Sequence, residues 1–481
     1  MYGMQNTKLI QLLRSMNTSE FREFKDFVIS PVFNKNKKTI VLFDAIIKFY
    51  PVFESEQLKA ENIFSKIFPG EDYDYFKLKN IISDLFGLGK EYLAFIHFRD
   101  ISEVKEKFLL EQLRDRNLDN IFEITYKAYK KKLENISVRD ENYIFKCLEL
   151  TEELHSFQIP KDPKTRLNFF QIELDYFLKY AVIRLLKFYN IMLHDKIQNN
   201  VNFDLKMFDE VMNYLKNNKT EDNPTLLVFY YIILLGTERN EKYFYELKEF
   251  KDRNFDSLNN ADRYMVFLHM ANFCAYVYNN LGKTDFMYEH FLLSKENFDR
   301  GSIILGKVLY PDFLNHVKIA VRVNEFEWAE NYIKKFEHLL SEEKESTLNF
   351  CYGFICYKKG DPDKALDLLS RTNFPEFIIK IQVKILLLQI NYEKEYYEQA
   401  LLMIDSFRHY LQRERSIPDG SKESFYDFLK MTNDLIKLKT DADPVIKKFE
   451  LQKLKENTGN MKSNQFGIKI WLNEKILDFR F

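Results

Sequence analysis

The segment Tyr352 to Arg371, YGFICYKKGDPDKALDLLSR, carries the signals of a complete helix-turn-helix unit. Its first half ends in Lys359-Gly360, which is typical of a helix C-terminus, because glycine readily adopts the left-handed conformation that ends a helix. Asp361-Pro362 follows as an N-cap and a proline at the first helical position. Ala365 lies one turn inside the second half, where a small side chain lets two helices approach closely. The segment therefore predicts two packed helices joined by a short turn.

The same pattern recurs on both sides of this segment. Ala400 takes the corresponding place 35 residues after Ala365, and Ala329 takes it 36 residues before. Met287 takes this place in a fourth unit, 42 residues before Ala329. The turns of the four units are expected at Leu281-Gly282, Val323-Asn324, Lys359-Gly360 and Lys394-Glu395. This spacing predicts an all-α fold in which helix-turn-helix units stack as a repeat solenoid.

The composition favours helices over strands and gives no global charge. Only 13 Gly and 11 Pro occur among 481 residues, while hydrophobic residues make up 46%. The chain thus has ample material for a core but lacks the turn residues that many short strands need. Lys and Arg number 71 against 72 Asp and Glu. A balanced charge provides no global attraction for nucleic acid or an anionic membrane.

The cysteines and the apolar runs predict a cytoplasmic protein without a membrane segment. Cys147, Cys274, Cys351 and Cys356 are scattered on apolar helix faces without a CxxC pair, which is typical of reduced cysteines. The N-terminus lacks the pattern of a secretory signal. The longest apolar run, Leu226 to Leu235, is shorter than the roughly 20 residues that cross a bilayer.

Helix start and stop signals divide the chain into four segments. Residues 1–100 are expected to form an N-terminal helical module, and residues 101–158 to form connecting helices. The segment Ile159 to Pro163 contains two prolines and interrupts any continuing helix. Residues 164–440 then hold the repeats, and residues 441–481 are expected to cap the open end of the stack.

A period near 34 residues, with a small residue early in the first helix and alanine in the second, resembles the tetratricopeptide repeat. Gly353 and Ala365 match these positions, and the likeness covers about residues 265 to 410. Met287 and Thr372 depart from the pattern, because both stand where alanine is usual. The whole chain, including SPVFNKNKK and IFPGEDYDYFKLKNIISDL, is also similar to a widespread family of uncharacterised bacterial helical-repeat proteins. That second resemblance implies no activity.

Motifs that would indicate an enzyme have simpler structural explanations. Gly301 to Val308, GSIILGKV, nearly matches a phosphate-binding loop, but Val308 cannot bind magnesium and no strand pattern precedes it. Gly87 and Gly89 lie within a helical stripe, where close helix packing explains them. None of the eight histidines has a metal-ligand spacing, and no Ser, Cys and His grouping indicates a nucleophile. The sequence therefore predicts a protein that is not an enzyme and needs no metal or cofactor.

The leading functional hypothesis is a scaffold that holds a protein or peptide segment on a concave surface, since stacked helix pairs generate such a surface. The alternative is a transcription regulator whose N-terminal module, residues 40–97, resembles a winged helix. A winged helix needs a hairpin after its recognition helix, and His97 to Asn117 lacks the pattern of one. The candidate recognition helix, Asp74 to His97, carries as many acidic as basic residues among its charged positions, so nucleic acid is not the expected partner.

The register of the units predicts which side chains face the concave side. They are polar or aromatic residues of the first helix of each unit, and tyrosine, lysine and arginine are common in binding hot spots. The predicted partner-binding residues are Asn272, Tyr276, Asn279, Lys318, Arg322, Tyr357, Lys358, Gln389 and Tyr392. The set differs from the clamp with which some repeat proteins hold a C-terminal carboxylate, so an internal, extended segment is expected. Two other readings stay open: these residues only solvate the inner face, or the chain's own C-terminus covers them.

Overall fold

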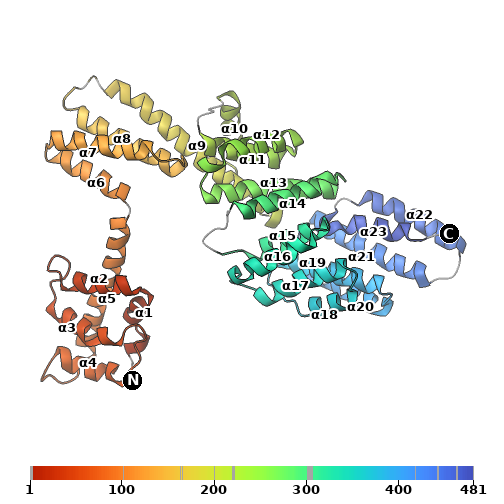
Figure 1. Cartoon of the computed structure of the whole chain (residues 1–481), viewed down its shortest axis with the longest axis horizontal. Helices are drawn as coiled ribbons and strands as arrows, with labels where there is room; N and C mark the ends of the chain where they lie inside the picture. Colours follow the sequence, from red (N-terminus) through yellow and green to blue (C-terminus); the bar gives the residue numbers. More distant parts are fainter. Residues whose placement is uncertain are drawn as a thin grey trace. The chain divides into compact units, whose positions relative to one another are not determined.

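The computed structural model describes residues 4–100, 102–162, 164, 166–199, 201–218, 223–300, 307–415, 417, 419–440, 444–461 and 464–479. These residues are almost entirely helical, and no β-strand occurs among them apart from an isolated bridge between Val308 and Leu340 (Figure 1). The prediction of an all-α chain is confirmed. Residues 301–306, which hold most of the motif that resembles a phosphate-binding loop, lie outside the described residues.

Contacts divide the chain into two compact units. The first comprises Met1–Glu134 and Glu149–Arg166, and the second comprises Asn135–Leu148 and Leu167–Phe481. The helices of the first unit are α1 (Lys8–Ser15), α2 (Thr18–Ile29), α3 (Lys37–Ile46), α4 (Ala60–Ile67), α5 (Tyr75–Asp100), α6 (Ser102–Asp115) and α7 (Asp119–Glu134). Helix α8 (Glu141–Gln158) has residues in both units.

The start of α2 shows how closely local sequence determines the first unit. The Asn17 side chain accepts hydrogen bonds from the Ser19 and Glu20 N–H groups, and the Glu20 carboxylate accepts one from the Asn17 N–H at 2.8 Å. This reciprocal capping box fixes the helix start, so that the apolar stripe of α2 is turned into the core. The buried residues of that stripe are Phe21, Phe24, Phe27 and Val28.

The two glycines of α5 differ in their surroundings. A Cβ atom on Gly89 would lie 2.8 Å from Cδ2 of Leu12 in α1, whereas a Cβ atom on Gly87 would meet nothing within 4 Å. Close helix packing therefore accounts for Gly89 alone.

The second unit pairs helices that are consecutive in the chain. Contacts join α11 with α12, α13 with α14, α15 with α16, α17 with α18, and α19 with α20 (Figure 1). The bounds are α9 (Arg166–Asn199), α10 (Phe208–Asn217), α11 (Pro224–Glu238), α12 (Glu241–Asn254), α13 (Asn260–Asn280), α14 (Asp285–Asp299), α15 (Tyr310–Arg322), α16 (Phe326–Phe336), α17 (Lys344–Lys358), α18 (Pro362–Ser370), α19 (Phe377–Glu393), α20 (Tyr397–Arg413), α21 (Asp419–Thr440), α22 (Pro444–Asn460), the 3-10 turn η7 (Gln465–Gly467) and α23 (Ile468–Leu477).

Three consecutive helix pairs have the same turn. Asn324, Gly360 and Glu395 adopt the left-handed conformation, with φ of 64°, 87° and 58°. Each donates its N–H to the carbonyl three residues earlier at 3.1 Å, and the residue after it donates to the carbonyl five residues earlier at 2.9 Å. These two bonds are those of a Schellman C-cap, which satisfies carbonyls that the end of a helix leaves without partners. The three left-handed residues coincide with three of the turns expected from the sequence.

The small residues that mark these pairs in the sequence are all buried. Ala329, Ala365 and Ala400 are fully buried. The first helix of the middle pair contributes Gly353, on which a Cβ atom would lie only 2.9 Å from Cγ of Leu369. The first helix of that pair therefore has no room for a larger side chain at Gly353 unless Leu369 moves.

We expect Ala365→Leu to lower the free energy of unfolding by roughly 1–3 kcal/mol, because Ala365 is fully buried and a larger side chain there overpacks the core. Urea unfolding followed by tryptophan fluorescence measures the change, since both tryptophans, Trp328 and Trp471, lie in the second unit. The control is Lys364→Leu, which introduces the same residue at the neighbouring exposed position. Equal midpoints for the two variants would contradict the buried position of Ala365.

Candidate functional site

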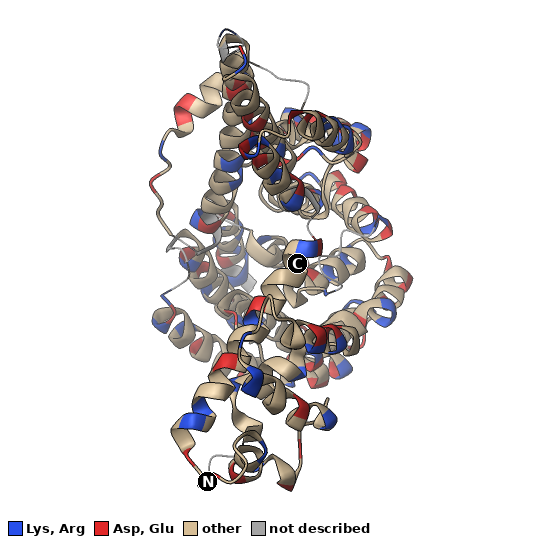
Figure 2. Cartoon of the chain, turned by 90° about the vertical axis from the view of Figure 1, so that its left-hand side faces the viewer, with Lys and Arg blue, Asp and Glu red and all other residues tan. Residues whose placement is uncertain are grey.

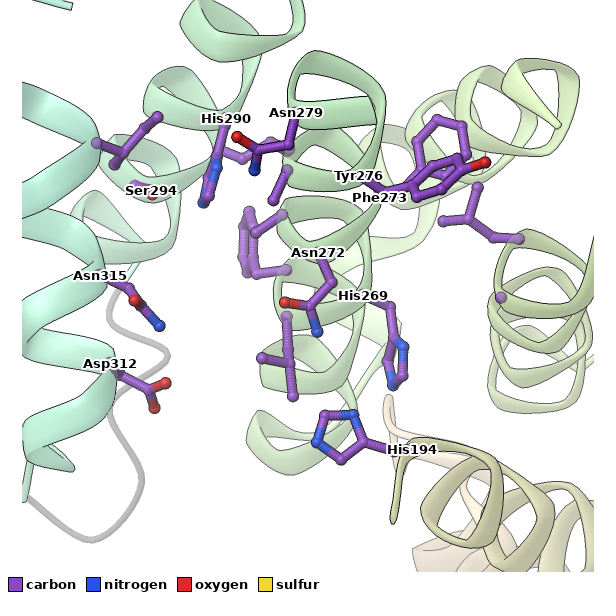
Figure 3. A pocket seen from close by; sticks show the side chains of 18 of the residues that line it. His194, His269, Asn272, Phe273, Tyr276, Asn279, His290, Ser294, Asp312 and Asn315 are labelled. Atoms are coloured by element: carbon purple, nitrogen blue, oxygen red, sulfur yellow. The ribbon is translucent and has the colours of Figure 1, made fainter. Parts of the chain in front are cut away.

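A cavity of about 630 Å³ lies within the second unit. Its walls are formed by α9, α11, α13, α14 and α15, and Gln382 of α19 and Phe466 of η7 complete the lining. Figure 3 shows Asn272, His290, Asp312 and Asn315 facing the space between α13 and α15. Three helix pairs therefore combine to build one concave site.

Five of the nine predicted partner-binding residues line this cavity. Asn272, Tyr276 and Asn279 come from α13, and Lys318 and Arg322 come from α15. Residues three or four positions apart share one face of a helix, so each set projects from a single stripe. The helical register brings together residues that are up to 50 positions apart in the chain, from Asn272 to Arg322.

The other four predicted residues lie elsewhere, and the C-terminal helix meets this part of the surface. Gln389 and Tyr392 are buried, and Tyr357 is half-buried, while Lys358 is exposed. The ring of Tyr392 lies 5.3 Å from that of Trp471, measured between centroids. Tyr392 is therefore out of reach of a partner while α23 is in place.

One carboxylate joins α23 to the helix pairs. Glu393 accepts hydrogen bonds from the Tyr357 hydroxyl and from Nε1 of Trp471, both at 2.9 Å. It also pairs with Nζ of Lys475 at 2.9 Å. Two of these three donors belong to α23, so Glu393 anchors the C-terminal helix to the end of α19.

The segment before α23 reaches the rim of the cavity. Nδ2 of Asn464 donates to the carbonyl of Asn279 at 2.8 Å. Arg322 donates from Nη2 to the carbonyl of Phe466 at 3.5 Å, and from Nη1 to the Tyr278 hydroxyl at 3.4 Å. Both bonds of the Arg322 guanidinium are long and go to neutral oxygens.

Lys318 and Arg322 are cations without a carboxylate partner among the residues that the structure describes. Nζ of Lys318 donates to Oε1 of Gln382 at 2.7 Å. Burial lowers the pKa of Lys318 to about 7, and the nearby charge of Arg322 lowers it too. Both side chains are half-buried, and a partly buried cation without a counter-ion is unfavourable, so this pair indicates a place where a negative group would be stabilised.

Four of the eight histidines converge on the cavity, which their sequence spacing did not predict. They are His194, His269, His290 and His316. Burial lowers the pKa of His269 and His316 to about 4 and that of His290 to about 3. These three imidazoles are therefore neutral at pH 7. Within the described residues, no group of three or more His, Cys, Asp or Glu side chains could hold a metal ion.

Several polar atoms of the cavity wall lack a hydrogen-bond partner. They are Nδ1 of His290, Oγ of Ser294, Oδ1 of Asn297 and Nδ1 of His316. Ser294 is only 3% exposed, so its hydroxyl has no access to bulk solvent. Buried polar groups are nearly always hydrogen-bonded, so four such atoms in one wall are an unusual concentration of unsatisfied polar groups.

Asp312 lies at the edge of the cavity away from Arg322. The Tyr264 hydroxyl donates to Oδ2 of Asp312 at 2.5 Å. Burial raises the pKa of Asp312, and the hydrogen bond from Tyr264 opposes this change. The site thus has two cations at one end and an acid with a raised pKa at the other.

The first unit shows interleaved charges rather than a surface of one sign (Figure 2). Lys77 of α5 pairs with Glu71 at 2.6 Å, and Arg99 pairs with Glu23 at 2.7 Å. These basic groups already have acidic partners, which leaves less positive charge for phosphates.

No protein-family model, curated protein or solved structure matches the chain. Among the helices that the structure describes, none is long and apolar enough to span a bilayer.

We expect the free energy of unfolding to fall as the pH decreases from about 6.5 to 4. The buried histidines have a lower pKa in the folded protein than the ordinary value of 6.5, so the unfolded chain binds more protons in this window. His316→Gln should reduce the slope of stability against pH by up to about 1.4 kcal/mol per pH unit. Urea unfolding at a series of pH values measures it.

The exposed His409 provides the control for this prediction. His409→Gln should leave the slope unchanged. If both variants show the same slope of stability against pH as the wild type, the cavity histidines do not titrate as their burial implies.

Proposed function

We propose that the chain is a non-enzymatic helical-repeat scaffold, similar to tetratricopeptide-repeat proteins, that binds an extended segment of another protein. The observation that carries the proposal is the cavity between α13 and α15. Five residues that the repeat register assigns to the inner face line this one cavity, although they come from two helix pairs. A side-by-side arrangement of first helices is what a concave binding surface requires.

The recurring turns support the repeat interpretation. The left-handed residues Asn324, Gly360 and Glu395 are 36 and 35 positions apart, and their hydrogen bonds have the same pattern. Gly282, another left-handed residue, lies 42 positions before Asn324. A chain that repeats one helix pair at this period turns the first helix of each pair to the same side.

The chemistry of the cavity favours a peptide over an apolar ligand. Amide side chains of Asn272, Asn279 and Gln382 line it beside Phe273 and Leu293. Asparagine and glutamine can both donate hydrogen bonds to a peptide backbone and accept them from it, while apolar walls accommodate side chains.

We also place the protein in the cytoplasm, with residues 164–440 as the repeats and residues 441–481 as their cap.

The alternative function, a transcription regulator with a winged-helix-like module at its N-terminus, ranks second. Helices α6 and α7 follow α5 at the place where a winged helix has its β-hairpin. Acidic side chains also pair with Lys77 and Arg99. DNA binding needs a basic face that remains available for phosphates.

The test uses a random peptide library displayed on phage and selected against the full chain. Asn272→Arg places a long side chain in the cavity from an exposed position of α13, so it should block the site without disturbing the core. We expect this variant to bind the selected peptides at least about tenfold more weakly, as measured by fluorescence anisotropy.

The matched control is Asn331→Arg, the same substitution at an exposed position of α16. It should bind like the wild type. Selection that yields no binding peptide, or peptides that bind both variants equally, would reject the cavity as the functional surface.

A further inference from the structure

The end of the cavity near Lys318 and Arg322 has the composition of an anion subsite. The two residues are four positions apart on α15, so their side chains lie on one face of the helix. Lys318 donates to a neutral amide oxygen and Arg322 to a carbonyl and a hydroxyl. Two positive charges therefore share a partly enclosed space with neutral partners alone among the described residues.

Independent observations at the same end indicate a missing polar partner. The hydroxyl of Ser294 is buried without a hydrogen bond, and Nδ1 of both His290 and His316 is in the same situation. Burial lowers the pKa of His290, and the charges of His316, Arg322 and Lys318 lower it further, so these four groups lie near one another. These unpartnered atoms and the two cations together make this end of the cavity wall poorly satisfied in polar contacts.

We propose that Lys318 and Arg322 bind the side-chain carboxylate of an aspartate or glutamate within the protein segment that the cavity holds. This inference rests on the proposed function and identifies the chemistry of the partner: an acidic, internal peptide segment.

The balance of charges favours a carboxylate over a phosphate. The neutral histidines add no positive charge at pH 7, so the subsite offers between one and two positive charges. An acceptor oxygen also lies there, because the carbonyl of Phe466 is 3.5 Å from Nη2 of Arg322. Such an oxygen repels a phosphate dianion but accepts hydrogen bonds from the N–H groups of a peptide.

Binding should become weaker as the pH rises from 6 to 8. The pKa of Lys318 is about 7 because of its burial and because Arg322 lies nearby, so the free amine loses its charge in this range. The other titratable groups around it are His316 on the same helix, His290 on α14 and Cys351 on α17. The histidines are already neutral, and burial raises the pKa of Cys351, so Lys318 is the group that titrates.

The experiment uses two small probes of nearly the same shape, one with a carboxylate and one with a neutral amide. N-acetyl-glutamate N-methylamide imitates an internal glutamate, and N-acetyl-glutamine N-methylamide is its neutral analogue. Thermal unfolding of the full chain is measured with increasing amounts of each probe at constant ionic strength, because a ligand of the folded state raises the melting temperature. We expect the glutamate probe to bind about tenfold more tightly than the glutamine probe.

Variants assign this preference to the subsite. Lys318→Gln combined with Arg322→Gln should remove the difference between the two probes. The control combines Lys334→Gln with Lys335→Gln, which removes two positive charges from exposed positions of α16 and should keep the difference. A preference that survives in the first variant, or equal binding of both probes to the wild type, would overturn the proposal. Inorganic phosphate is tested alongside, and stabilisation by phosphate without stabilisation by the glutamate probe would also overturn it.

A second measurement does not depend on the folding of a variant. An amine-reactive acylating reagent at pH 7 labels neutral lysine amines, and mass spectrometry gives the rate at Lys318. A carboxylate bound to Lys318 favours the charged form, so the glutamate probe should slow labelling of Lys318 while the glutamine probe leaves it unchanged. An equal rate with both probes would contradict the assignment. If the glutamate probe binds but no selected peptide does, the anion subsite stands and the scaffold function fails.

Discussion

The left-handed residue at the end of each first helix is the constraint on which the helix pairs of the second unit depend. It turns the chain within two residues and satisfies the final carbonyls, so that the second helix starts at a fixed angle. The alanine five residues later then donates its N–H to the carbonyl of the residue after the turn, as Ala365 does to Asp361 at 3.2 Å. Because this geometry recurs at Asn324, Gly360 and Glu395, the first helices α15, α17 and α19 end in the same way.

Local chemistry explains how much of this could be predicted. Gly360 and Asp361 predict a turn at their position, because glycine tolerates a positive φ and aspartate caps a helix. Glu395 has a φ of 58° with no such signal, and only its distance from Gly360 located the turn. The capping box at Asn17 is likewise readable, because it depends on neighbours in the chain. The sequence did not distinguish Gly89 from Gly87, because the contact of Gly89 is with Leu12 on another helix. Helix content and pairing thus follow from short-range rules.

The cavity could be predicted only in part, because its remaining features arise from packing between distant segments. A helical register gives the faces of α13 and α15, which is why Asn272 and Arg322 were found. The helical register does not predict that the rings of His194 and His269 lie 6.1 Å apart, measured between centroids. These two residues are on separate helices and 75 positions apart in the chain. The contact between Trp471 and Glu393 spans 78 positions. No sequence period connects such pairs.

By holding α23 against the end of α19, Glu393 makes the surface there harder for a ligand to reach than the cavity between α13 and α15. Near α19, a ligand has to displace α23, which belongs to the same chain and is therefore present at an effective concentration on the order of millimolar for a short tether. Its tether is the segment that binds Asn279 and Arg322 through Asn464 and Phe466. Among the described residues, the segment before α23 reaches the cavity between α13 and α15 at its rim, so a ligand that entered this cavity would leave α23 in place. A partner that occupied the cavity and disturbed the Asn464 and Phe466 contacts would loosen the tether, and each part of the surface would then influence how readily the other is filled.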